Sequence, residues 1–175
     1  MADGLNSARL FTTWFGPLPE TTVAITQQSN WFFGQSWPSL IFLPYLAFLD
    51  GTQRQRLGLT QAKDFVDQVG YHEFAHQWWG HLVGAATYRD EWLEEGFAEF
   101  SAALAVQHTQ GWDGYHDFWR SARKNIFGKY PGNMISHDKV GPISQGWRLG
   151  TAHTRSAPQA MIYSKGAYVL HMLRT

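Results

Sequence analysis

Apolar residues recur along the chain with two different periods, and the period changes near residue 50. Residues 21–28 (TTVAITQQ) and 39–48 (SLIFLPYLAF) are short runs rich in β-branched and aromatic residues. Such runs, bounded by Gly, Pro, Ser and Asn, are typical of strands. We predict a strand over each run, with a loop over residues 29–38 between them and a turn at Asp50 and Gly51.

From residue 60 to 79 the spacing becomes helical. Apolar positions recur there at steps of three and four residues, at Phe65, Val66, Val69, Phe74 and Trp78, which indicates one face of an α-helix. Thr60 is the expected N-cap, and Gly80 is the expected terminator. The patterns predict three further helices, over residues 91–111, over 115–127 and after Pro158, with loops over 128–133 and 140–158.

Strands followed by helices predict an α+β fold. The length of 175 residues and the mass of 20.0 kDa suit one domain, because a chain of this size can bury a sizeable core. We predict a single domain over residues 1–175, with a β-rich part over 9–50 and a helical part over 51–175.

Composition excludes some functions and narrows the chemistry. The net charge is zero and the pI is about 7.1, so no broad basic field attracts nucleic acid or an anionic membrane. The chain has no cysteine, so a metal would have to be held by imidazole and carboxylate groups. Charged residues make up 16% and aromatic residues 16%. These shares indicate either a well-filled core or apolar surface that a second domain or subunit covers.

The chain shows no membrane or export signal. The most apolar stretch, residues 40–49, has about half the length that a membrane span needs and contains Pro44. The start, MADGLNSARL, lacks a basic segment followed by an apolar run. We expect a soluble chain, and the sequence leaves its compartment open.

The segment HEFAH, residues 72–76, places two histidines four positions apart around a glutamate. On a helix, residues i and i+4 share one face with Cβ atoms about 5–6 Å apart, so His72 and His76 can reach one ion. Glu73 points about a quarter turn further round, where it can contact a water on that ion. The alternative is a pair of ordinary helix histidines, one packed and one solvated, because the motif is short.

A third ligand candidate follows on the next predicted helix. Glu95 lies in EWLEEGFAEF, separated from His76 by the eighteen residues 77–94. Two antiparallel helices joined by a short connection can bring these positions together.

The segments HEFAHQWWGHLV, WLEEGFAEF and YSKGAYVLHML, in this order and spacing, resemble the M1 family of zinc metallopeptidases over about residues 9–173. The resemblance implies a thermolysin-like zincin (gluzincin) catalytic domain that binds one Zn²⁺ and cleaves peptides, usually as an aminopeptidase. It implies His72, His76 and Glu95 as zinc ligands, Glu73 as general base and Tyr163 as the group that stabilises the transition state. Residues 9–50 would form the substrate groove.

This residue set suits peptide hydrolysis. Two imidazoles and one carboxylate leave an open zinc position for water, whose pKa the metal lowers. Glu73 is expected to take a proton and return it to the leaving amine. Tyr163 is expected to donate to the developing oxyanion.

Two acidic residues are candidates for supporting roles. Glu99 lies one turn beyond Glu95, where it can accept a bond from a ligand imidazole or remain solvated. Asp90 matches an acidic position common before this motif in the family, although it and Glu94 can equally be a cap and surface charges. The other histidines lack a partner at ligand spacing and are interpreted as solvated or packed: His81, His108, His116, His137, His153 and His171.

One family element is missing. M1 aminopeptidases usually carry Gly-x-Met-Glu-Asn, whose glutamate binds the substrate's free amine. Here the matching stretch puts Ser36, or Gln35 after a one-residue slip, at that position, and residues 21–49 contain no acidic residue. Gln27, Gln28 and Gln35 can line the groove or be satisfied locally.

Three functions therefore stay open. They are an aminopeptidase, an endopeptidase or differently anchored exopeptidase, and a catalytically silent peptide-binding domain. Family members also flank this domain with a β-domain and a helical domain. We therefore expect a partial catalytic domain, able to self-associate through faces that such domains would cover.

Overall fold

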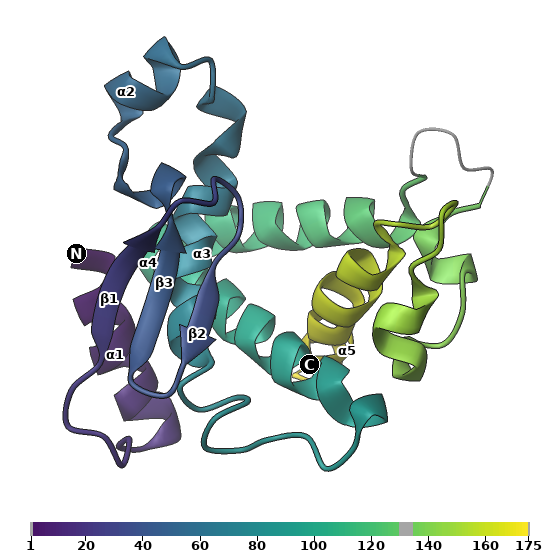
Figure 1. Ribbon diagram of the computed structural model, residues 1–175, viewed down its shortest axis with the longest axis horizontal. Coiled ribbons are helices and arrows are strands. Elements are labelled where there is room, and N and C mark those ends of the chain that lie inside the picture. Colours follow the sequence, from purple (N-terminus) through teal and green to yellow (C-terminus); the bar gives the residue numbers. More distant parts are fainter. Residues whose placement is uncertain (1, 130–134, 175) are drawn as a thin grey trace.

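The computed structural model describes residues 2–129 and 135–174. It contains a small three-stranded sheet and a larger set of helices beside it (Figure 1). The predicted α+β architecture is confirmed in this form. Residues 130–133 of the loop predicted over 128–133 lie outside the described residues.

The sheet has the strand order β1-β3-β2. Strands β1 (Ala24–Gln28) and β3 (Leu40–Pro44) are parallel, whereas β2 (Gln35–Trp37) pairs antiparallel with β3. The central strand β3 carries the most apolar sequence and buries Ile41 almost completely. Strand β2 is therefore an edge strand, with one side free of sheet pairing.

The strand predictions need three corrections. The strand predicted over 21–28 begins only at Ala24. The predicted strand over 39–48 ends at Pro44, because residues Tyr45–Phe48 form a 3₁₀ turn in which Tyr45 N–H donates to Asn30 O (3.0 Å). The predicted loop over 29–38 contains strand β2. Three residues with two polar side chains are too short to show a strand period, so only pairing with β3 reveals it.

The N-terminal helix α1 (Ala2–Phe15) was not anticipated. It extends into the segment 9–50 that we predicted as β-rich. Phe11 is fully buried, with its ring 6.1 Å from that of Trp78, and the Phe15 ring lies 5.2 Å from that of Trp79. Helix α1 is thus stabilised by aromatic packing on residues that follow the HEFAH segment.

The Asp50–Gly51 turn is the start of the short helix α2 (Gly51–Arg56). The Asp50 carboxylate accepts from Gln53 N–H, and the Gln53 side chain accepts from Asp50 N–H. This reciprocal pair is a capping box.

Helix α3 (Lys63–Ala75) is shorter than the predicted 60–79. Thr60 belongs to a 3₁₀ turn (Thr60–Ala62), and Ala62 occupies the N-cap position, so the predicted N-cap is wrong. The helix ends at Ala75 because the chain turns away through Gly80, whose φ of 108° suits glycine.

Helix α4 (Glu91–Phe127) is interrupted at Gly111, which has φ 75° and ψ −164°. Its two parts run in different directions (Figure 1), in agreement with the separate helices predicted over 91–111 and 115–127. After Pro158, a π-helical turn (Gln159–Lys165) leads into α5 (Gly166–Leu173).

The core lies where α1, α3, α4 and α5 meet. It is rich in alanine and aromatic residues, including Phe11, Trp78, Ala98, Ala102, Phe118, Trp119 and Ala167. Small alanines on α4 let neighbouring helices approach closely, while the large rings fill the remaining space.

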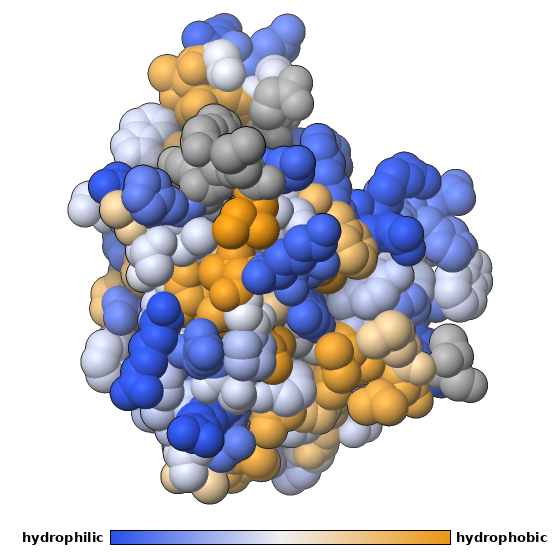
Figure 2. Space-filling view, turned by 90° about the vertical axis from the view of Figure 1, so that its right-hand side faces the viewer, coloured by the Kyte–Doolittle hydropathy of each residue, from blue (hydrophilic) through white to orange (hydrophobic). Residues whose placement is uncertain are grey.

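Some large apolar side chains stay at the surface, among them Phe32, Phe33, Trp37 and Trp112. On the face drawn in Figure 2, hydrophobic residues form separate patches among hydrophilic ones. Within the described residues, no helix combines the length and the apolar character that a membrane span requires.

Candidate metal centre

Three side chains from two helices converge on one point. His72 lies on α3, His76 follows its last residue, and Glu95 lies on the first turns of α4. The two Nε2 atoms are 3.1 Å apart, and each lies 3.2 Å from Glu95 Oε2. These residues form a group of possible metal ligands.

The outer nitrogen of each imidazole is bound elsewhere. His76 Nδ1 lies 2.8 Å from Trp79 O, and His72 Nδ1 lies 2.9 Å from Glu99 Oε2. A carbonyl and a carboxylate only accept, so both Nδ1 atoms carry the proton. A neutral imidazole then directs the Nε2 lone pair to the common point.

The third atom at this point is also an acceptor. Among the described residues, Glu95 Oε2 is buried without a hydrogen-bond partner, although both Nε2 atoms lie 3.2 Å away. Three acceptors facing one another are costly unless a positive charge lies between them. The arrangement therefore fits a cation.

The triangle is close in size to a zinc site. In a tetrahedral site with bonds of about 2.0–2.1 Å, neighbouring ligand atoms lie about 3.3–3.5 Å apart. The edges of 3.1 and 3.2 Å are slightly shorter. The donor set of two imidazoles and one carboxylate is also one that zinc accepts when a fourth position stays open.

Electrostatics at the site favours positive charge. Burial alone would lower the pKa of His72, but the adjacent carboxylates of Glu95 and Glu99 raise it well above its usual value. Burial alone would raise the pKa of Glu95, but His72 and His76 hold it well below its usual range. The same carboxylates stabilise a cation of any kind at this point, whether a proton or a metal ion.

Glu73 is buried beside the three candidate ligands, at 7% exposure. Burial raises the pKa of its carboxyl, so this group holds a proton more readily than an exposed glutamate does. A Cβ atom at Gly34 would lie 2.2 Å from Glu73 Oε1 and 2.7 Å from its Cγ. Only glycine leaves room for the carboxylate there. Sequence reasoning missed Gly34, although a glycine within an aromatic loop indicates a close backbone approach.

Tyr163 lies in the π-helical turn, with its ring stacked at 5.6 Å on that of His72. The centroid of the Trp147 ring lies 6.3 Å from that of the Tyr163 ring. Burial, together with Glu95, raises the pKa of the phenol, so its O–H stays protonated and able to donate. Single π-turns inside helices occur frequently at functional sites.

Two glycines bring the tyrosine turn against α4. A Cβ on Gly96 would lie 3.0 Å from the Gly166 carbonyl carbon, and one on Gly166 would lie 3.2 Å from Gly96 Cα. The backbones of α4 and α5 therefore touch one residue after Glu95. Both glycines lie inside the motif segments, but their role follows only from this contact.

Comparison with known proteins agrees with this geometry. The sequence profile of the peptidase family M1 domain matches residues 38–175. The chain belongs to peptidase family M1. The structure is similar to the solved M1 zinc metallopeptidase from Deinococcus radiodurans, with a TM-score of 0.59 and 25% sequence identity. The match covers 98% of this chain and 32% of that chain.

Human endoplasmic reticulum aminopeptidase 2 is 34% identical over 116 residues, which cover 64% of this chain. Mouse glutamyl aminopeptidase is 32% identical over 114 residues, or 62% of this chain. The matched region spans 11% of the length of each of these relatives.

The remaining acidic candidates have different hydrogen-bond partners. Glu99 contacts the imidazole of the candidate ligand His72. The Asp90 carboxylate instead accepts from the Thr87 hydroxyl at 2.7 Å. Glu94 accepts from the Ala85 N–H and so ties the connection between α3 and α4 to α4 itself.

The three glutamines are not brought together. Gln27 and Gln28 lie on β1, which β3 separates from Gln35 on β2. The Gln28 side chain donates to Phe33 O, within the loop that carries Gly34. Of the three, only Gln35 lies on the strand next to Glu73.

The expected packing of other histidines is visible at two of them. His137 is buried, with its ring nitrogens bonded to Asn125 O and Ser156 Oγ. The His171 ring stacks on that of Trp119 at 4.2 Å. Both histidines are therefore packed against other parts of the fold.

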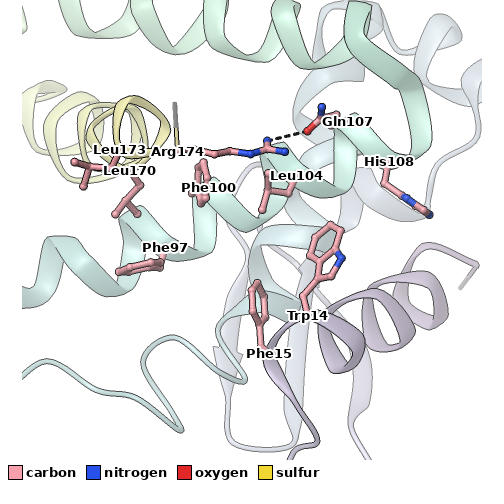
Figure 3. Close-up of a pocket in the computed structure, with 10 residues that line it drawn as sticks. All are labelled: Trp14, Phe15, Phe97, Phe100, Leu104, Gln107, His108, Leu170, Leu173 and Arg174. Carbon is pink, nitrogen blue, oxygen red and sulfur yellow. Dashed lines mark hydrogen bonds between the residues drawn. The ribbon is translucent and has the colours of Figure 1, made fainter.

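One cavity lies apart from the candidate metal centre. It has a volume of about 750 Å³ and is lined by Trp14, Phe15, Phe97, Phe100, Leu104, Gln107, His108, Leu170, Leu173 and Arg174 (Figure 3). With about 100° between successive helix positions, Phe97, Phe100 and Leu104 lie on the face of α4 roughly opposite to Glu95 and Glu99.

Proposed function

We propose that this chain is a thermolysin-like catalytic domain of a zinc peptidase, which hydrolyses peptide bonds. The proposal treats residues 1–175 as one domain, with the sheet beside the substrate groove and the helices carrying the metal site. The observation that carries it is the meeting of three acceptor atoms of His72, His76 and Glu95 at 3.1–3.2 Å, next to the buried Glu73.

His72, His76 and Glu95 would hold one Zn²⁺. When bound, zinc supplies a Lewis acid that polarises the peptide carbonyl and makes water more acidic. Glu99 and the Trp79 carbonyl orient the two imidazoles through their Nδ1 protons. Such outer partners keep the ring nitrogens aimed and increase ligand basicity.

Glu73 is the proposed general base. It accepts the proton of the attacking water at its carboxylate and passes it to the leaving amine nitrogen. Its burial raises its pKa, which makes it a stronger base than an exposed glutamate. Gly34 leaves the space in which this carboxylate lies.

Tyr163 is the proposed hydrogen-bond donor to the carbonyl oxygen as negative charge develops. Its raised pKa keeps the O–H in place, and stacking on His72 holds the ring beside the ligands. Donors of this kind contribute about 3–4 kcal/mol to transition-state stabilisation in other enzymes.

The relatives are named as aminopeptidases, which supports cleavage at a free N-terminus. One observation favours a second specificity. At the position expected to bind the amine, Ser36 Oγ accepts from the Gln77 side chain at 2.8 Å, and its neighbour Gln35 carries no charge. A neutral acceptor binds an ammonium less strongly than a carboxylate does, so cleavage inside a peptide is the alternative.

The test is hydrolysis of a fluorogenic aminoacyl substrate and its N-acetylated form, together with zinc content by elemental analysis. We expect one zinc per chain, activity lost with a chelator and restored by zinc, and faster cleavage of the free amine. Faster cleavage of the acetylated form would show that the chain cleaves inside peptides and is not an aminopeptidase. If zinc is bound but neither substrate nor a longer peptide is cleaved, the chain is a peptide-binding domain without catalytic activity, and the proposal is wrong.

A further inference from the structure

The edge strand β2 and the segment before it run along the HEFAH segment in a fixed register. Gly34 lies against Glu73, and two residues later Ser36 bonds to Gln77, four residues after Glu73. Two residues of extended chain span about 6.6 Å. The alternate positions 34 and 36 therefore contact positions 73 and 77 of the segment that carries the proposed ligands.

The Gln77 amide holds this register. Its Nε2 donates to Ser36 Oγ at 2.8 Å and to Trp37 O at 3.0 Å, and its Oε1 accepts from Ser39 N–H at 2.9 Å. The side chain is 3% exposed. A buried amide with three bonds to one hairpin fixes that hairpin far more firmly than apolar contact does.

The hairpin turn needs such support. Ser39 has a φ of 58°, and it is the sole non-glycine with positive φ in the described part of the chain. Pro38 precedes it, and proline followed by a positive φ is the pattern of a type II turn. Two-residue hairpins favour the mirror-image turns, because type II splays the strands. Gln77 bonds to this turn on both sides of Pro38, at Trp37 O and at Ser39 N–H.

We propose that Gln77 is a positioning residue that sets the register of β2 on the metal-binding segment. It thereby keeps Gly34 over Glu73 and holds the free edge of β2, where an extended peptide can pair, at a constant distance from the metal centre. This inference rests on the proposed function for its effect on substrate, but its structural part can be measured without turnover.

The decisive variant is Gln77→Leu in the zinc-loaded protein, measured by amide hydrogen exchange and by kinetics. Loss of the three bonds should increase exchange over residues 35–40 at least tenfold, with zinc content unchanged. KM should rise about tenfold while kcat changes by less than a factor of two. A structural role alone would instead lower the folded fraction and apparent kcat with KM unchanged, and that result would overturn the proposal.

A second substitution tests the turn itself. Because glycine adopts positive φ without strain, adding Ser39→Gly to Gln77→Leu should restore part of the exchange protection and of the KM. Absence of any rescue would show that turn geometry is not what Gln77 maintains.

Tyr115→Phe is the matched control. It removes a buried hydroxyl bonded to His171 and Arg174, far along α4, and should leave KM and exchange over 35–40 unchanged. A similar change in this control would attribute the Gln77 effect to general destabilisation and overturn the proposal. If the wild type lacks turnover, the proposed function fails, whereas the exchange measurement still decides the role of Gln77.

Discussion

The two faces of helix α4 differ in what they present. One face carries Glu95 and Glu99, each within 3.2 Å of a histidine nitrogen on or just after α3. The other carries Phe97, Phe100 and Leu104, which line a cavity of about 750 Å³. The first face is small, polar and convergent, and the second is wide and apolar.

This difference shows which structural signal points to chemistry. A large pocket is the usual first candidate for an active site, but here the cavity of about 750 Å³ is lined mainly by apolar side chains. At the polar face, three lone pairs meet around one point, and such an arrangement requires a cation. Convergence of unsatisfied groups is therefore more informative in this domain than cavity size.

The largest effect is expected on the polar side, from Glu73→Gln. The amide keeps the shape of the carboxylate but accepts protons poorly, so kcat/KM should fall by roughly 10²–10⁴-fold. Zinc content should stay at the wild-type value, because Glu73 is not among the three proposed ligands. Peptide hydrolysis measures kcat/KM, and elemental analysis of the same sample measures the zinc content. Turnover near the wild-type rate would show that Glu73 is not the general base.

A smaller effect is expected one step from the metal, from Glu99→Gln. The His72 Nδ1 proton then loses its charged acceptor at 2.9 Å, and zinc affinity should fall by roughly 10–100-fold. Competition with a chromophoric chelator measures the affinity. Replacing Asp90 by Asn provides the control, because its partner is Thr87, and an equal loss there would make the Glu99 contact irrelevant.

The smallest effect on activity is expected on the apolar face, from Leu104→Ala. Removing part of this half-buried side chain should reduce the free energy of unfolding by about 1–2 kcal/mol and leave kcat/KM within a factor of two. Urea unfolding and peptide hydrolysis would test the pair of expectations. Lost turnover in a folded variant would show that the two faces of α4 are coupled.

Local patterns predicted the part of the site that lies within single helices. The four-residue spacing of His72 and His76 follows from helix geometry, and Glu95 followed from its place on the next helical segment. The break at Gly111 was also predicted, because glycine interrupts the apolar period there. Tyr163 came from resemblance to a family, since an aromatic residue on a helix carries no distinctive period.

Other features depend on neighbours far along the chain. Strand β2 exists because β3 pairs with it, and helix α1 is held by the rings of Trp78 and Trp79. The end of α3 at Ala75, four residues before the predicted one, coincides with the bonds of Gln77 and His76 to Ser39, Trp37 and Trp79. Periodicity cannot show such contacts, because it reports only local preference.

By itself, the sequence predicted the residue types of the proposed metal centre, their helical spacing and the α+β order of elements, because these depend on local backbone geometry. Tertiary structure alone decided that Gly34 lies against Glu73, that Gly96 meets Gly166, and that Gln77 holds the β2–β3 turn. Each of these is a close contact between segments that are distant in the sequence. Whether such a contact stabilises the fold depends on the space available between the segments rather than on the local preference of either residue.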